Sequence, residues 1–203
     1  MRKDTRIVAI TGASGTLYGL RLIQELLKRG DDTAVIISPS GFLVLEQETG
    51  LRLKGDRLSV AKGLRKYFGR TRGKINYYPS NDISSQLSSG SSLIRDMVVC
   101  PCSMGTLARI ASGISGNLIE RTADVVLKEK GRLIIVPRET PLNQIHLENM
   151  LKLCKMNAHI IPAMPAFYHK PEKIGDLVDF VVGKILDAMG IENRLYKRWG
   201  SWK

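Results

Sequence analysis

The 203-residue sequence has few of the residues that bind metals or form disulfides, with three cysteines and three histidines. Cys100 and Cys102 are separated by one proline, and a bridge between them would be strained. Neither the cysteines nor the histidines occur at the spacing of a zinc finger or of an H-E-x-x-H site. We therefore expect reduced, buried thiols and no metal site.

Long hydrophobic runs are also missing. No apolar run approaches the roughly 20 residues that span a bilayer. The first apolar stretch, residues 6–10, ends at Thr11 and is too short for the core of a secretory signal. The 43% hydrophobic content is ordinary, and a chain of this length can bury a full core. We expect one domain over residues 1–203, in the cytoplasm and without membrane contact.

Acidic residues are few, with 19 Asp and Glu against 31 Lys and Arg, which gives a net charge of +12. Nine basic residues and one acid, Asp56, lie between Arg52 and Lys74, so this segment alone contributes +8. Such a segment can bind nucleic acid, but no zinc finger, helix-turn-helix signature or RNA-binding aromatic motif accompanies it. We favour a solvated helical face followed by a loop, and expect no nucleic-acid partner.

Short β-branched runs alternate with amphipathic segments along the chain. Strands are predicted at residues 6–10, 33–37, 75–78, 97–100, 133–136 and 159–161. Helices are predicted at 17–28, from a Ser40 cap through Glu48, at 104–111 and 118–128, along a stripe from Leu147 to Cys154, and at 174–189. This alternation predicts an α/β fold with a parallel sheet flanked by helices on both faces. The tail at about 192–203, with Trp199 and Trp202, is expected to pack against another surface, such as a neighbouring subunit.

The turn after the first strand is the first candidate ligand site, because open parallel sheets bind ligands at the carboxyl ends of their strands. Its sequence, Thr11–Gly15, contains glycines that let a ligand approach and leads into a helix N-terminus that favours an anion. Thr16 and Tyr18 replace the later glycines of a dinucleotide-binding turn. Ser38 stands where such a fold has an acid for the ribose. NAD is therefore disfavoured, and a mononucleotide such as FMN fits better.

Two later turns also carry polar groups. Ser103 and Thr106 can cap a helix or offer hydroxyls and amides to a ligand. After the strand at 133–136, Arg138 can hold a phosphate and Glu139 can move a proton. Tyr168 offers a phenol. Purely structural roles, as a helix cap and as a salt bridge at the rim, are the alternatives; for Arg138 and Glu139 we favour function because they follow a strand's carboxyl end.

Taken together, these motifs resemble the UbiX-type flavin prenyltransferases, within the class of homo-oligomeric flavin-containing cysteine decarboxylases. The resemblance covers nearly the whole chain. The matching segments are residues 11–15, 37–38, 48–49, 89–91, 100–103, 117–125, 127–129, 136–142, 146–151, 165–169 and 198–200.

The resemblance implies a flavodoxin-like Rossmann fold that assembles into trimers and then dodecamers, with FMN at subunit interfaces. It assigns FMN contacts to Gly12, Ala13, Ser14, Ser38, Ser103, Met104, Gly105, Thr106 and Arg138. It assigns the prenyl phosphate to Tyr168 and Lys184, with Ser89, Gly90, Arg121, Lys128 and Glu139 nearby. Glu48 matches an acid of the site that an adjacent subunit can supply.

The implied reaction is transfer of a dimethylallyl group from dimethylallyl monophosphate to N5 and then C6 of reduced FMN, without magnesium. The product serves a UbiD-type decarboxylase. The cations that would stabilise the departing phosphate in place of a metal are Arg121, Lys128, Arg138 and Lys184. Glu139 and Ser14 would help to move protons, and Glu48 and Lys128 also belong to the implied catalytic set.

Two positions depart from the family pattern. Lys184 stands where many members have arginine, so bidentate geometry is lost, and Pro39 follows Ser38 where lysine is common. The main rival function is that of an FMN-dependent cysteine decarboxylase of the same fold, although the asparagines of its motifs are missing from residues 101–106 and 137–140. A nucleic-acid-binding module and a direct decarboxylase of aromatic acids are two further rival functions. Monophosphate and diphosphate donors are both compatible with the sequence.

Overall fold

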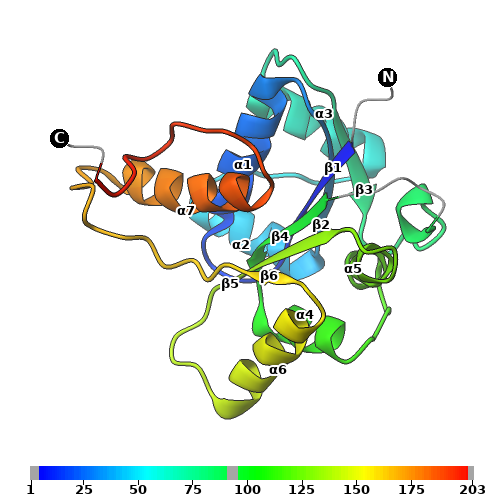
Figure 1. Cartoon of the computed structure of the whole chain (residues 1–203). Helices are drawn as coiled ribbons and strands as arrows, with labels where there is room; N and C mark the ends of the chain where they lie inside the picture. Colours follow the sequence, from blue (N-terminus) through cyan, green and yellow to red (C-terminus); the bar gives the residue numbers. More distant parts are fainter. Residues whose placement is uncertain (1–4, 91–95, 201–203) are drawn as a thin grey trace.

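The computed structural model, which describes residues 5–90 and 96–200, has six strands in one parallel sheet (Figure 1). The strands are β1 (Thr5–Ile10), β2 (Asp32–Ile37), β3 (Ile75–Pro79), β4 (Asp96–Cys102), β5 (Arg132–Pro137) and β6 (His159–Ile160). Their order is β3-β2-β1-β4-β5-β6. If the edge strand β3 is set aside, the other five strands have the order of a flavodoxin-like sheet. The predicted fold class is therefore confirmed.

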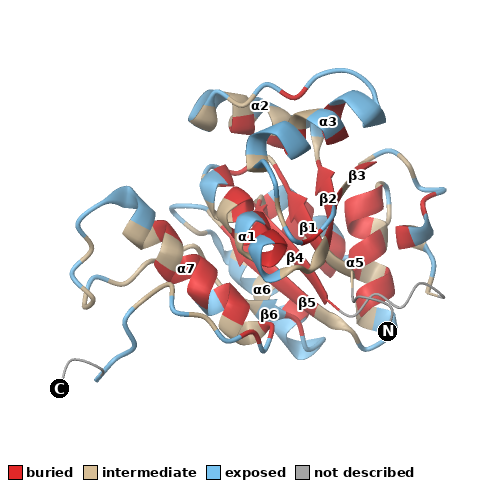
Figure 2. Ribbon diagram, turned by 90° about the horizontal axis from the view of Figure 1, so that it is seen from above, coloured by how far each residue is buried: buried red, intermediate tan, exposed pale blue. Residues whose placement is uncertain are grey.

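Helices cover both faces of the sheet, so the residues of the inner strands are buried almost without interruption although successive side chains point to opposite faces. The helices are α1 (Thr16–Arg29), α2 (Pro39–Thr49), α3 (Arg57–Phe68), α4 (Met104–Ala111), α5 (Leu118–Lys128), α6 (Gln144–Lys155) and α7 (Ile174–Ala188). A short 3₁₀ turn, η1 (Gln86–Ser88), precedes β4. Val8 and Ile10 of β1 face a core shared with α1, α2, α3 and α7, whereas Ile7 and Ala9 face a core shared with α4, α5 and α6. Figure 2 shows the buried residues on the strands and on the inner sides of the helices.

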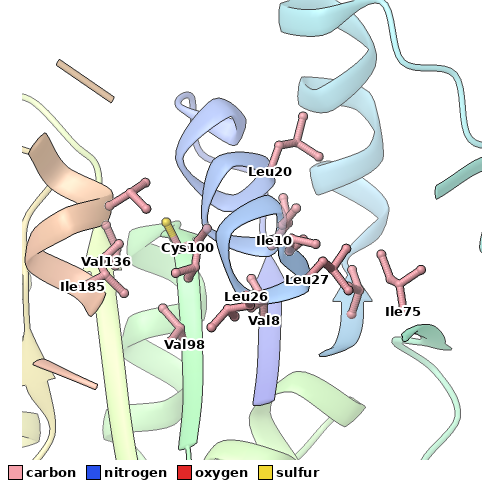
Figure 3. Packing of buried hydrophobic residues seen from close by; sticks show 14 of the residues in the cluster. Val8, Ile10, Leu20, Leu26, Leu27, Ile75, Val98, Cys100, Val136 and Ile185 are labelled. Carbon is pink, nitrogen blue, oxygen red and sulfur yellow. The ribbon is translucent and has the colours of Figure 1, made fainter. Parts of the chain in front are cut away.

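Helix α1 is held over the middle of the sheet. Figure 3 shows Leu26 and Leu27 of α1 close to Val8, while Ile185 of α7 lies beside Val136. An ion pair between α1 and α7, from Arg21 Nε to Asp179 Oδ1 at 2.6 Å, fixes the two helices relative to each other. Helix α1 is therefore anchored both to the sheet and to α7.

The predicted strands and helices are confirmed, with three corrections. The cap of α2 is Ser38 and not Ser40: Ser38 Oγ accepts a hydrogen bond from Gly41 N at 3.0 Å, and Pro39 suits the first helical position. The stripe on α6 is helical, but Leu147 and Leu151 are exposed. Cys154, on the same side, is exposed too, so the prediction of buried thiols is correct only for Cys100 and Cys102.

Two expectations cannot be placed on the structure in full, since Ser91 of the 89–91 motif and Trp202 of the tail lie outside the described residues. Among the helices of the described ranges, none is long and apolar enough to cross a membrane.

Candidate active site

The turns after β1 and β4 meet at the point where the strand order reverses, which is where open α/β sheets bind ligands. The buried Thr11 joins them. Its hydroxyl donates to Pro101 O at 2.9 Å and accepts from Ser103 N at 2.7 Å. The segments 11–15 and 103–106, which the sequence predicts as two candidate sites, therefore form one continuous surface.

The glycines of the first turn are required by its geometry. A Cβ on Gly12 would lie 2.4 Å from Ser40 Cβ, so the turn packs directly against the start of α2. Gly15 has φ of 96°, a left-handed conformation that glycine adopts without strain. Ala13 between them is buried, whereas Ser14 is exposed at the surface of the turn.

A carboxylate of the same chain already occupies the N-terminus of α1. Glu48, at the end of α2, accepts hydrogen bonds from Gly15 N and Thr16 N at 2.8 Å and from Thr16 Oγ1 at 2.6 Å. Burial raises the pKa of Glu48, but hydrogen bonds from Ser14, Thr16 and the Gly15 amide outweigh it and hold the pKa below its ordinary value. Glu48 is thus an ionised cap for α1.

The helices that follow β2 and β4, α2 and α4, are capped by serines. Ser38 caps α2, and Ser103 caps α4 by accepting from Thr106 N at 3.3 Å. The first-turn amides of α4, at Met104 and Gly105, have no acceptor within the helix. Gly105 is exposed, and a Cβ added there would have no heavy atom closer than 3.8 Å. This helix start is therefore open to an anion.

Arg138 connects the turn after β5 to the turns after β1 and β4. Its amide donates to Cys102 O at 3.3 Å, and its side-chain Nε donates to Ser14 O at 3.2 Å. Within residues 5–90 and 96–200, its two terminal guanidinium nitrogens have no hydrogen-bond partner. The neighbouring Glu139 is exposed and accepts from Thr140 N at 3.2 Å. A positive charge and a carboxylate thus stand at the rim of the joined turns.

A second group of predicted site residues lies on α5 and beside η1. Arg121 donates from Nε to Ser88 O at 3.2 Å and from Nη1 to Asp124 Oδ2 at 2.9 Å. Gly90 packs against the end of α5, where a Cβ on it would lie 3.2 Å from Lys128 Nζ. Ser89, just before it, is exposed.

This second group is separated from the joined turns. Helix α5 begins near the carboxyl edge of the sheet, where Leu118 N donates to Ser80 O just after β3, and ends just before β5 begins. Lys128 therefore lies near the amino ends of the strands, whereas Arg138 lies at their carboxyl ends. The structure of one chain does not bring these two predicted site residues together.

A third group surrounds α7. Tyr168 contacts Phe180 edge to face at 5.8 Å, and Lys184 Nζ lies 5.3 Å from the centre of the Tyr196 ring. Trp199 of the tail packs on Tyr168 at 5.1 Å, so the tail folds back onto its own chain. Burial, followed by a hydrogen bond to Asp187, raises the pKa of Tyr196 to about 12. Lys184 itself stays exposed, with the Tyr196 ring beside it.

Two features of the site were missed in the sequence. Tyr18 is half-buried below Gly15; burial, followed by the nearby Cys100, raises its pKa. Glu120 is only 1% exposed and accepts from Gly116 N at 2.9 Å and Asn117 Nδ2 at 2.8 Å, and it pairs with Arg109 across α4 and α5. The spacing of Asn117 and Glu120 is that of a capping motif, which could have indicated the second feature.

Comparisons with known proteins agree with this architecture. The sequence model of the family described as Flavoprotein matches residues 1–186. Flavin prenyltransferase UbiX from Halalkalibacterium halodurans is 53% identical over 199 residues, which cover 98% of this chain and 95% of the relative.

Two solved structures are also similar. AnUbiX (PadA1), in complex with FMN and dimethylallyl pyrophosphate, is 37% identical with a TM-score of 0.88, and 100% of each chain is covered. A dodecameric FMN-dependent UbiX-like decarboxylase from Escherichia coli O157:H7 is 38% identical with a TM-score of 0.85, over 96% of this chain and 98% of that one. The chain therefore belongs to the flavoprotein family and, within it, to the UbiX flavin prenyltransferases.

Proposed function

We propose that this protein transfers a dimethylallyl group from dimethylallyl monophosphate to N5 and C6 of reduced FMN. The observation that carries the proposal is the full-length likeness to AnUbiX, whose structure holds FMN and dimethylallyl pyrophosphate. The joined turns at the carboxyl edge of the sheet, with Arg138 at their rim, support it from this chain's own geometry.

FMN fits the joined turns. We assign its contacts to residues that meet there: Gly12, Ala13, Ser14, Ser38, Ser103, Met104, Gly105, Thr106 and Arg138. The N-terminus of α1 is already neutralised by Glu48, whereas the first turn of α4 and the terminal nitrogens of Arg138 have no anion in the described residues. The flavin phosphate therefore belongs near α4 rather than at α1.

The donor phosphate needs positive charge where its bond to the allyl carbon breaks. Reduced FMN supplies electron-rich N5 and C6 atoms as the acceptor. Lys184 and Tyr168 would bind the departing phosphate, and Lys128, Arg121 and Arg138 would stabilise its charge without a metal. Glu139 and Ser14 would move protons at the rim. Lys184 has no carboxylate partner in the described part of the chain, so its charge is available for a phosphate.

This site needs more than one copy of the chain, because Lys128 and Arg138 lie at opposite edges of the sheet. We propose a homo-oligomer in which α5 of one copy faces the joined turns of another, assembled as a dodecamer like the Escherichia coli neighbour. We place the activity in the cytoplasm, since reduced flavin and the exposed thiol of Cys154 both suit a reducing compartment. A UbiD-type decarboxylase would take up the product.

The test is a mass measurement of the flavin. The protein is loaded with FMN and reduced without oxygen, and dimethylallyl monophosphate or diphosphate is added in parallel. A flavin heavier by one five-carbon prenyl unit, formed faster from the monophosphate, supports the proposal. Unmodified FMN with both donors, together with oxidative decarboxylation of a cysteinyl peptide, would contradict it and favour the cysteine decarboxylase.

A further inference from the structure

Most of the net positive charge of this chain is carried by α3 and the segments that flank it. Nine basic side chains of this region are all exposed: Arg52, Lys54, Arg57, Lys62, Arg65, Lys66, Arg70, Arg72 and Lys74. We call this set the basic face. Figures 1 and 2 place α3 at the edge of the sheet that carries β3, on the opposite side of the molecule from α6.

Little of this charge is neutralised within the chain. Asp56, the one acid of the segment, caps α3 by accepting from Ser59 N at 2.8 Å. Arg52 pairs with Glu46 at 2.6 Å, and Arg57 donates to Tyr77 O at 3.1 Å. In residues 5–90 and 96–200, the other seven cations of the basic face have no ion pair. A face of this charge favours an anionic partner.

An apolar side chain stands among these cations. Leu58 is 77% exposed, and it shares a stripe with Lys62 and Arg65 at helical spacing. The core is on the other side of α3, so this stripe points to solvent. Solvated charge alone does not require an exposed leucine among arginines, whereas the core of a protein interface is apolar and enriched in arginine.

The basic face is also hollowed at the end of α3. A cavity of ≈ 390 Å³ lies between α3 and the start of β3, lined by Arg65, Arg70 and Lys74 together with the apolar Phe68 and Ile75. A cavity with both apolar and cationic lining residues suits an apolar side chain flanked by carboxylates. A phosphate backbone would match the cations but has no apolar group to contact Phe68 and Ile75.

We propose that the basic face docks an acidic surface of another protein, one that presents an apolar side chain between its carboxylates. A two-fold contact between the basic faces of two copies is disfavoured, because it would set like charges against each other. Nucleic acid would match the charge but would leave Leu58 and the apolar lining of the cavity unused. This proposal is independent of the prenyl transfer proposed above.

The probe is a fluorescent glutamate-rich peptide with leucine and tryptophan at its centre, and the readout is anisotropy with the FMN-loaded full-length protein. A peptide with serine in place of the two apolar residues and a duplex DNA of equal charge are measured alongside. The variant Lys62→Glu/Lys66→Glu changes the solvent side of α3. The variant Lys152→Glu/Lys155→Glu makes the same charge change on α6, where both lysines are exposed.

We expect the apolar-centred peptide to bind more tightly than the serine peptide and the DNA. The α3 variant should weaken its binding about tenfold, Leu58→Asn should weaken it severalfold, and the α6 variant should change it less than about twofold. All variants should still form the heavier flavin. Tighter DNA binding would overturn the proposal in favour of nucleic acid. Equal effects of the two double variants, or equal binding of the two peptides, would overturn it by showing that only net charge is at work.

Discussion

Glu48 offers a quantitative test of the ligand-binding edge, because its carboxylate is the only anion that caps α1 in the described residues. We expect Glu48→Ala to lower the free energy of unfolding by about 2 kcal/mol. Water can replace part of the lost contact at this exposed site, so we count about one charged hydrogen bond and a helix-dipole contribution of about 0.5 kcal/mol. For a chain of this length, the melting temperature should fall by about 4–8 °C.

The pH dependence of this loss distinguishes an ionised cap from simple packing. The pKa of Glu48 is lowered in the folded state, so its stabilisation is fully present above the unfolded pKa of about 4.3. It is lost as the pH falls through the lower folded pKa. The gap between wild type and Glu48→Ala should therefore be constant near neutral pH and shrink below about pH 4.

The assay is thermal unfolding by circular dichroism at fixed protein concentration and without FMN, at pH 7 and at lower pH values. Glu46→Ala is the matched control, since Glu46 lies on the same helix and, among the residues that the structure describes, forms an ion pair only with the exposed Arg52. Its cost should stay below about 0.5 kcal/mol. Equal losses in the two variants, or a gap that persists unchanged in acid, would refute the reasoning.

Three further predictions concern the same edge and its support. Arg138→Ala should weaken FMN binding about tenfold in a fluorescence titration, and recovery by Arg138→Lys to wild-type affinity would show that the guanidinium geometry is not used. Glu120→Ala should cost about 3 kcal/mol in urea unfolding because three donors lose their acceptor, and a cost below about 1 kcal/mol would contradict the buried network. Burial raises the pKa of Cys100 and Cys102, so a thiol reagent should modify Cys154 alone in the folded protein; rapid labelling of a second cysteine would disagree with the structure.

The sheet and most helices follow from local sequence signals, because β-branched runs and 3.6-residue periodicity act over a few neighbouring residues. The pattern at 174–189, for example, predicts α7 almost to its observed end at Ala188. The same signals do not reveal which side of a helix is covered. On α6 they correctly indicate a helix, yet Leu147 and Leu151 lie in solvent in the single chain.

The candidate site was predictable as a set of turns but not as a set of contacts. Parallel strands bring their carboxyl ends to one edge, so the approach of Ser103 to the first turn follows from the fold class. The capping of Gly15 by Glu48 joins residues 33 positions apart and depends on how α2 packs. The separation of Lys128 from Arg138, by contrast, follows from chain order, because α5 ends just before β5 begins whereas Arg138 follows the end of β5.

The placement of Lys128 and Arg138 at opposite edges has a consequence for mixtures of variants. If every site borrows Lys128 from a neighbour, Lys128→Ala and Arg138→Ala chains that are each inactive should complement one another when unfolded together and reassembled. With equal amounts and random assembly, about a quarter of the sites would combine an intact turn from one chain with an intact α5 from the next. The activity of each site in such a mixture would then depend on which two copies are in contact, and not on the sequence of one chain.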